Sequence, residues 1–280
     1  VKRMPVDTYR TQSRGGRGVS AQNLKEEDYV KSLNIASTHD HMLFFTDAGR
    51  VHHRKGYQIP EAGRTARGTA MVNVLPLEPG EAVTAMVVTR EFDENEYLMM
   101  VTKNGTVKRL PVSALKNIRQ TGIRALRLDE GDSLISVRET DGTRKIIIAT
   151  HDGSAVCFDE TEVRPMGRTA VGVRGIRLRE GDYVVGAARA KEGHEVLAIT
   201  EKGFGKKTPV ERFCEKLNAK GFEAFIYESP LDKIMKEVAA GKPFNLNLYF
   251  AGKNAISEFV SGMDIVITFF DVANGHPVFG

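Results

Sequence analysis

The sequence lacks the features that define several classes of protein. Its two cysteines, Cys157 and Cys214, are too few for a disulfide scaffold and are typical of a protein in a reducing cytoplasm. No apolar run approaches the roughly 18 residues that a membrane-spanning helix needs. The chain begins with Val1 rather than Met, without a secretory pattern, which predicts an internal piece of a longer protein. We therefore expect a cytoplasmic protein that does not enter a membrane.

Patterns for catalysis and for cofactor binding are missing as well. Neither Gly-Lys-Ser/Thr nor a strand-loop-helix context follows Gly16-Arg17-Gly18, so no nucleotide fingerprint is indicated. The histidines between residues 39 and 53 have no cysteine or carboxylate at a ligand spacing. No Ser/His/Asp set has support in the sequence. We expect no catalytic residue, no metal and no cofactor in this chain.

What is present is the composition of a globular protein, with 41% hydrophobic and 27% charged residues. The net charge of +4 is placed unevenly. The excess of positive charge belongs to residues 1–213, whereas residues 214–280 carry more acidic than basic residues. An uneven distribution can hide a basic surface for nucleic acid behind a modest net charge.

Two patterns repeat in phase along the first 213 residues. Glycine-bearing loops recur at intervals of about 50 residues, with aligned glycines at Gly18, Gly68, Gly122 and Gly172. Between them, apolar runs of about five residues are followed by a short polar turn ending in glycine and a second run. The turn glycines are Gly49, Gly105, Gly153 and Gly203. Each hairpin of this kind needs positive φ at its turn, which glycine adopts at no steric cost.

Each repeat therefore predicts about four short antiparallel strands and almost no helix. A single four-stranded sheet cannot bury both of its faces, and units of this size stack radially as propeller blades. We predict an all-β, propeller-like domain of about four blades over residues 1–213. Residues 214–280 break the repeat and predict a separate α/β segment, with a helix at Pro230–Gly241 and strands at Asn245–Phe250 and Asp264–Phe270.

The most distinctive stretch is the glycine-rich segment 9–20, YRTQSRGGRGVS. Three arginines, Arg10, Arg14 and Arg17, alternate with glycines and no acid. Glycine lets a backbone approach a phosphate closely, and arginine supplies permanently charged donors. A solvated glycine turn with incidental arginines explains the composition equally well.

Basic pairs recur on the second strand of the hairpins. VKRMP (1–5), VKRLP (107–111) and GKKTP (205–209) align, each closed by proline. Equivalent positions in a radial stack share one rim, so these charges predict a curved basic track for DNA phosphates. Lysine on edge strands also protects against aggregation, which is the alternative for any one pair. The predicted rim residues are Lys2, Arg3, Arg10, Arg54, Lys55, Lys108, Arg109, Lys206 and Lys207.

Residues 12–18, QSRGGRG, resemble the seven-residue box of the DNA gyrase A family, with Ser13 in place of one basic residue. The segments 38–51, 68–81, 163–182 and 203–209 resemble the blades of the same family, so the resemblance covers residues 1 to about 212. It implies a β-pinwheel, a variant of the propeller. It also implies that the matching box residues contribute to wrapping double-stranded DNA: Gln12, Arg14, Gly15, Gly16, Arg17 and Gly18.

The resemblance further implies a place in a type II DNA topoisomerase that introduces negative supercoils. In that family the rest of the gyrase A polypeptide forms a dimer, and the gyrase B polypeptide hydrolyses ATP with Mg²⁺. The domain with the catalytic tyrosine is absent here, so the resemblance implies no activity for this chain alone. Two alternatives stay open: the corresponding domain of topoisomerase IV, and a propeller that binds protein, with its charge incidental.

Overall fold

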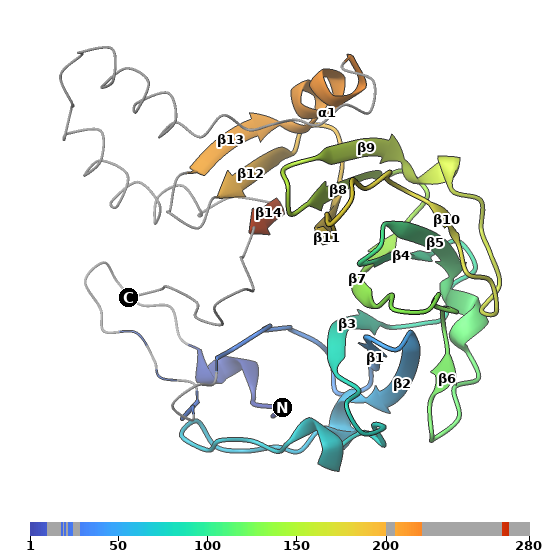
Figure 1. The fold of residues 1–280 in the computed structure, drawn as a ribbon. Helices are drawn as coiled ribbons and strands as arrows, with labels where there is room; N and C mark the ends of the chain where they lie inside the picture. Colours follow the sequence, from blue (N-terminus) through green and yellow to red (C-terminus); the bar gives the residue numbers. More distant parts are fainter. Residues whose placement is uncertain are drawn as a thin grey trace.

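The repeats fold into a curved row of small β-sheets (Figure 1). The computed structural model describes residues 1–9, 18, 20, 22–24, 29–199, 205–219 and 265–268. The strands are β1 (His41–Thr46), β2 (Arg50–Lys55), β3 (Val83–Thr89), β4 (Tyr97–Thr102), β5 (Thr106–Pro111), β6 (Ile123–Arg124), β7 (Leu134–Thr140), β8 (Lys145–Thr150), β9 (Ala155–Asp159), β10 (Val173–Arg174), β11 (Val184–Ala190), β12 (Glu195–Ile199), β13 (Gly205–Pro209) and β14 (Ile265–Thr268).

Helical structure among these residues is limited. One α-helix is present, α1 (Val210–Ala219), together with short 3-10 helices at η1 (Val6–Thr8), η2 (Gly56–Gln58), η3 (Met71–Asn73), η4 (Val112–Leu115) and η5 (Glu160–Glu162). No helix in the described part of the chain is long and apolar enough to cross a membrane. The prediction of an all-β domain is confirmed.

The sheets are built on one plan. Blade one has the strand order β3-β1-β2-β6, and blade two has the order β7-β4-β5-β10. Blade three is β11-β8-β9, and the fourth sheet is β14-β12-β13, each with three strands in the part of the chain that the structure describes. The strands β3, β7, β11 and β14 line the inside of the arc, and the short strands β6 and β10 lie outermost (Figure 1).

The outermost strands come from a distant part of the sequence. Antiparallel β6 pairs with the start of β2, where Val51 lies opposite Ile123, and β10 pairs with the start of β5, where Val107 lies opposite Val173. Each of these two blades is therefore closed on its outer side by the glycine loop that follows the next hairpin. The predicted four antiparallel strands per unit are confirmed for blades one and two. The fourth sheet differs, because β14 runs parallel to β12.

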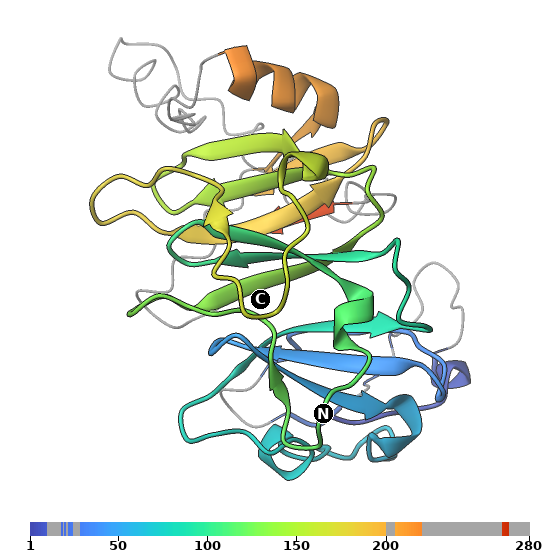
Figure 2. The same cartoon turned by 90° about the vertical axis from the view of Figure 1, so that its right-hand side faces the viewer.

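The core lies between the blades, which are seen stacked from the side in Figure 2. Alternate residues of a strand point to opposite faces of its sheet. In β4, Leu98 and Met100 pack toward blade one, and Met99 and Val101 pack toward blade three. Because both faces are covered, the central strands are continuous apolar runs. Burying each such side chain contributes about 1.5–3 kcal/mol.

The expected segment 214–280 is described only in part. The boundary at residues 213 and 214 falls within α1, and β14 lies within the strand predicted at Asp264–Phe270. The predicted helix at Pro230–Gly241 and the predicted strand at Asn245–Phe250 lie outside the described residues. Cys157 of β9 and Cys214 of α1 form a disulfide that joins blade three to this helix.

Candidate nucleic-acid interface

The glycine-rich box falls almost entirely outside the described residues. Gly18 is described and exposed, and a Cβ atom added there would meet nothing within 4 Å. The other box residues, together with Arg10, lie outside the described part of the chain: Gln12, Arg14, Gly15, Gly16 and Arg17. Their role in DNA binding stays a prediction.

Lys108, predicted on the exposed rim, is instead completely buried in β5. Its ammonium donates hydrogen bonds to the carbonyl oxygens of Ala125 (2.8 Å), Arg168 (2.8 Å) and Ala170 (3.0 Å). Burial lowers the pKa of Lys108 to about 8. The prediction was wrong at this position, because β5 is an interior strand with β4 on one side and β10 on the other.

Arg109 is also buried, and the prediction that it lies on the rim was wrong. Its Nε atom forms an ion pair with Glu160 Oε2 at 3.3 Å. Its guanidinium lies over the ring of Tyr97, 3.8 Å from the ring centre, where the negative face of the aromatic ring attracts a cation. The charge of this side chain is thus used inside the protein.

The N-terminal pair repeats the arrangement of Lys108 and Arg109. The Lys2 ammonium donates to the carbonyl oxygens of Gly63, Arg64 and Ala66, and the side chain is half-buried. Arg3 forms an ion pair with Glu61 at 2.9 Å. Both side chains are engaged by the loop that follows blade one's hairpin, and both stay partly exposed.

The two remaining basic pairs differ in their exposure. Arg54 is half-buried and donates to the carbonyl oxygens of Val74 and His53. Lys55 is half-buried as well, and its ammonium donates to the His39 carbonyl oxygen. Lys206 and Lys207 are exposed, and Lys207 forms an ion pair with Glu195.

Exposed positive charge gathers in the loops that close the outside of the blades. Segment 116–127 covers blade one and segment 163–179 covers blade two; together we name them the outer basic surface. They hold four and five basic residues respectively and no acidic residue. All nine side chains are exposed: Lys116, Arg119, Arg124 and Arg127, then Arg164, Arg168, Arg174, Arg177 and Arg179.

The backbone of these loops lies flat against the blades. Gly172 has a φ of +115°, and a Cβ atom there would lie 2.5 Å from the carbonyl oxygen of Val107. Gly122 has a φ of +81°, and a Cβ atom there would lie 2.7 Å from the ring of His52. Because the loop backbone touches the blade, Arg124 and Arg174, two residues further on, occupy equivalent exposed positions on the outermost strands β6 and β10.

Lys108 binds the backbone of the loop that carries exposed arginines. Two of its three acceptors, the carbonyls of Arg168 and Ala170, belong to the outer loop of blade two. The buried ammonium therefore fixes the backbone that displays the exposed arginines. Sequence reasoning missed these arginines because it followed basic pairs on the hairpins. The signal that would have found them is the absence of acidic residues from segments 116–127 and 163–179.

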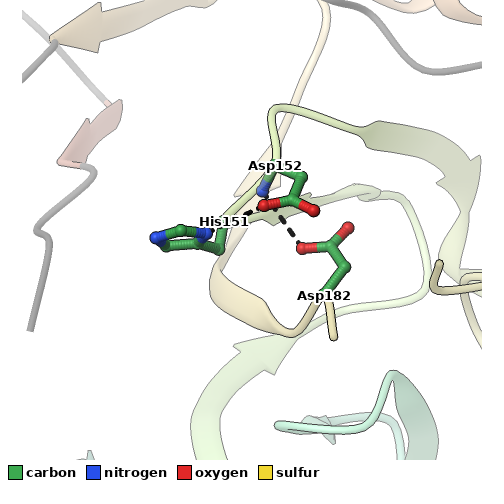
Figure 3. A group of neighbouring side chains, drawn as sticks. All are labelled: His151, Asp152 and Asp182. Carbon is green, nitrogen blue, oxygen red and sulfur yellow. Dashed lines mark hydrogen bonds and ion pairs between the residues drawn. The ribbon is translucent and has the colours of Figure 1, made fainter. Parts of the chain in front are cut away.

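One group of side chains has the composition of a metal site. His151, Asp152 and Asp182 meet at the turn between β8 and β9, with possible ligand atoms within 4.8 Å of one another (Figure 3). Asp182 accepts a hydrogen bond from the backbone N–H of Asp152, at 3.1 Å. In blade two Asp132 accepts the N–H of Asn104 in the same way. The position of Asp182 is thus explained by the turn, and the group gives no independent sign of a metal.

Comparison with known proteins agrees with the repeat architecture. A family model described as "DNA gyrase C-terminal domain, beta-propeller" matches residues 1–37, 40–90, 96–141, 144–191 and 194–213. The DNA gyrase A protein of Staphylococcus epidermidis (strain ATCC 12228) is 46% identical over 216 residues, which are 76% of this chain and 24% of the relative. Its counterpart in Staphylococcus aureus (strain NCTC 8325) is 47% identical over the same shares. The chain thus spans about a quarter of the length of these relatives.

Solved structures give the same result. The crystal structure of the C-terminal domain of DNA topoisomerase IV superposes with a TM-score of 0.61 and 29% identity, over 68% of this chain and 59% of that one. The structure of a DNA gyrase A C-terminal domain gives a TM-score of 0.60 and 25% identity, over 75% and 68%. The predicted β-pinwheel is confirmed, and the chain belongs to the DNA gyrase C-terminal domain family.

Proposed function

We propose that this chain binds double-stranded DNA on its outer basic surface and bends it around the arc of blades. The observation that carries the proposal is the set of nine exposed basic side chains on two acid-free loops of adjacent blades. Arginine suits this task because its planar guanidinium donates two hydrogen bonds to a phosphate and keeps its charge at every physiological pH. Binding of this kind reads the DNA backbone and carries little sequence preference.

The curvature of the outer basic surface supports the proposal that the bound DNA is bent and does not stay straight. Blades one and two present their outer loops on the convex side of the arc (Figure 1). A duplex that follows them must curve, and bending 20–30 base pairs by 40–90° costs about 1–6 kcal/mol. Several phosphate contacts along the path are needed to offset that cost. The exposed Lys206 and Lys207 of β13 add two further basic side chains on the fourth sheet, and the resemblance of residues 12–18 to the gyrase box predicts a contribution from that segment as well.

In the whole enzyme, the proposed role is that of the DNA-wrapping domain of gyrase A. The rest of the gyrase A polypeptide, as a dimer, and the gyrase B polypeptide would then be its partners in the bacterial cytoplasm. ATP hydrolysis with Mg²⁺ and negative supercoiling would belong to that assembly. The wrapped duplex would be delivered to a cleavage site supplied by the rest of the enzyme.

The first test measures DNA affinity against salt concentration. Each phosphate contact contributes about 0.9 to the slope of log K against log salt. The double variant Arg174→Ala/Arg177→Ala should reduce that slope by up to about 2. A matched control, Arg90→Ala/Lys191→Ala, removes two exposed charges from the loops that follow β3 and β11 and should leave the slope unchanged. Equal losses in the two double variants would contradict the assignment to the outer surface.

The second test asks whether bound DNA is wrapped. Nicked plasmid is sealed by ligase in the presence of increasing protein, and its linking number is then measured. A dose-dependent shift is expected if the DNA follows the arc with a defined hand. Binding without a change in linking number would mean that this chain binds DNA but does not wrap it by itself. No binding at moderate salt would favour a propeller that binds protein.

A further inference from the structure

The disulfide between Cys157 and Cys214 lies at a repeated position of the fold. Arg109 is the fourth residue after the turn glycine Gly105, and Cys157 is the fourth after Gly153. Arg109 of blade two contacts Glu160 of η5, which follows the hairpin of blade three. Cys157 of blade three contacts Cys214 of α1, which follows the hairpin of the fourth sheet.

The N-terminal segment follows the same rule. Arg3 aligns with Arg109 in the motifs VKRMP and VKRLP, and it pairs with Glu61 just after η2. The same kind of contact thus occurs at three places in the arc. In each, a side chain of a second hairpin strand, or of the N-terminal segment that aligns with such a strand, contacts the segment that follows the next hairpin. Two of these ties are ion pairs, and the third is covalent. The disulfide therefore takes the place of an ion pair at the junction between blade three and the fourth sheet.

The junction around the disulfide is apolar. Both cysteines are 4% exposed. They pack in one cluster with Ile147 and Ala188 of blade three and Val196 of the fourth sheet. The inner side of α1 completes the same cluster. An ion pair would be poorly placed in these surroundings, whereas a disulfide adds no charge that must be desolvated.

We propose that Cys157 and Cys214 are a redox-dependent tie that attaches α1 and the fourth sheet to blade three. Cys214 lies one residue beyond the end of the family match at residue 213, so the tie joins the family domain to the segment that follows it. With the disulfide formed, α1 is fixed covalently on the arc. With two thiols, α1 is held without a covalent link and opens more often.

The Cys157–Cys214 disulfide can form by thiol–disulfide exchange, with a low-molecular-weight disulfide as the oxidant. The thiolate of one cysteine attacks the small disulfide, which forms a mixed disulfide and releases one small thiolate. The second cysteine then attacks the protein sulfur of the mixed disulfide and releases the second thiolate. Two protons leave the protein thiols and two small thiols form. An excess of small thiol reverses both steps.

A mapping experiment tests the pairing in the full chain. The protein is equilibrated with oxidised or reduced glutathione, free thiols are alkylated, and the chain is digested with trypsin without reduction. The oxidised sample should give peptides 146–168 and 213–216 joined as one mass, and the reduced sample should give two alkylated peptides. Two alkylated peptides in both samples, or linkage between chains only, would overturn the proposal.

Hydrogen exchange tests the consequence for the junction, and it needs no DNA. Amides of α1 should exchange at least tenfold more slowly in the oxidised chain than in the reduced one, whereas amides of β1 serve as an internal reference and should not change. The variant Cys157→Ala/Cys214→Ala should show no response to redox state. Should that variant fail to fold, the wild-type comparison with its β1 reference decides alone. Equal α1 exchange in the two redox states would overturn the proposed tie.

Discussion

The buried ammonium of Lys108 is expected to hold the outer loop of blade two in place. Replacing it by Lys108→Met keeps most of the side-chain volume and its apolar stem. The change removes the three hydrogen bonds to the carbonyls of Ala125, Arg168 and Ala170. We expect the variant to fold but to be less stable, with the outer loop held on β5 by its backbone hydrogen bonds alone.

The size of the effect follows from the three acceptors. The carbonyl of Ala125 is buried, and a buried carbonyl left without a donor costs about 1–3 kcal/mol. The contacts to Arg168 and Ala170 are partly buried, so water can replace part of their bonding. Loss of the charged group also removes its desolvation cost, which offsets some of the damage. We therefore expect a loss of about 3 kcal/mol, equivalent to a fall of roughly 6–12 °C in Tm for a domain of this size.

Urea unfolding at pH 7, followed by circular dichroism, measures this difference. The control is Lys116→Met, an exposed lysine of the outer basic surface, which should change stability by less than about 0.5 kcal/mol. A Lys108→Met protein as stable as the wild type would refute the reasoning, since the three carbonyls would then not depend on the ammonium.

Three further outcomes are expected. The stability gap between wild type and Lys108→Met should widen by about 2 kcal/mol from pH 8 to pH 10. Over this range the unfolded lysine largely keeps its proton, whereas the folded lysine, with a pKa of about 8, releases it, so the free energy of unfolding of the wild type rises with pH. A narrowing gap in alkaline urea titrations would contradict this. Gly172→Ala should cost about 2–3 kcal/mol in thermal unfolding because of its positive φ, whereas Gly167→Ala, with open space around it, should be nearly neutral. Glu160→Gln should cost about 2–3 kcal/mol by leaving Arg109 buried without its counter-charge, and a double-mutant cycle with Arg109→Met should recover part of that loss; strict additivity would argue against a coupled pair.

Much of the fold could be predicted because its signals are local. A hairpin is specified by two apolar runs and a glycine between them, and four such units at a constant spacing specify a repeat architecture. The strand near residue 265 was predicted from its apolar run alone. Its parallel pairing with β12 was not predictable, since the partner and direction of an edge strand depend on where the chain returns in space.

Which basic side chains are exposed depends on contacts between residues far apart in the sequence, and the pattern of a single strand does not contain that information. Lys108 and Arg124 are both basic residues in strands of the same arc, yet one is buried and the other is exposed. The order of residues along the chain is enough to specify repeated β-hairpin units with excess positive charge over residues 1–213. Which of those charges reach solvent is set by the folded arrangement, because the loop that closes each blade comes from the following repeat. That loop covers the hairpin lysine and takes the outermost position with its own arginines.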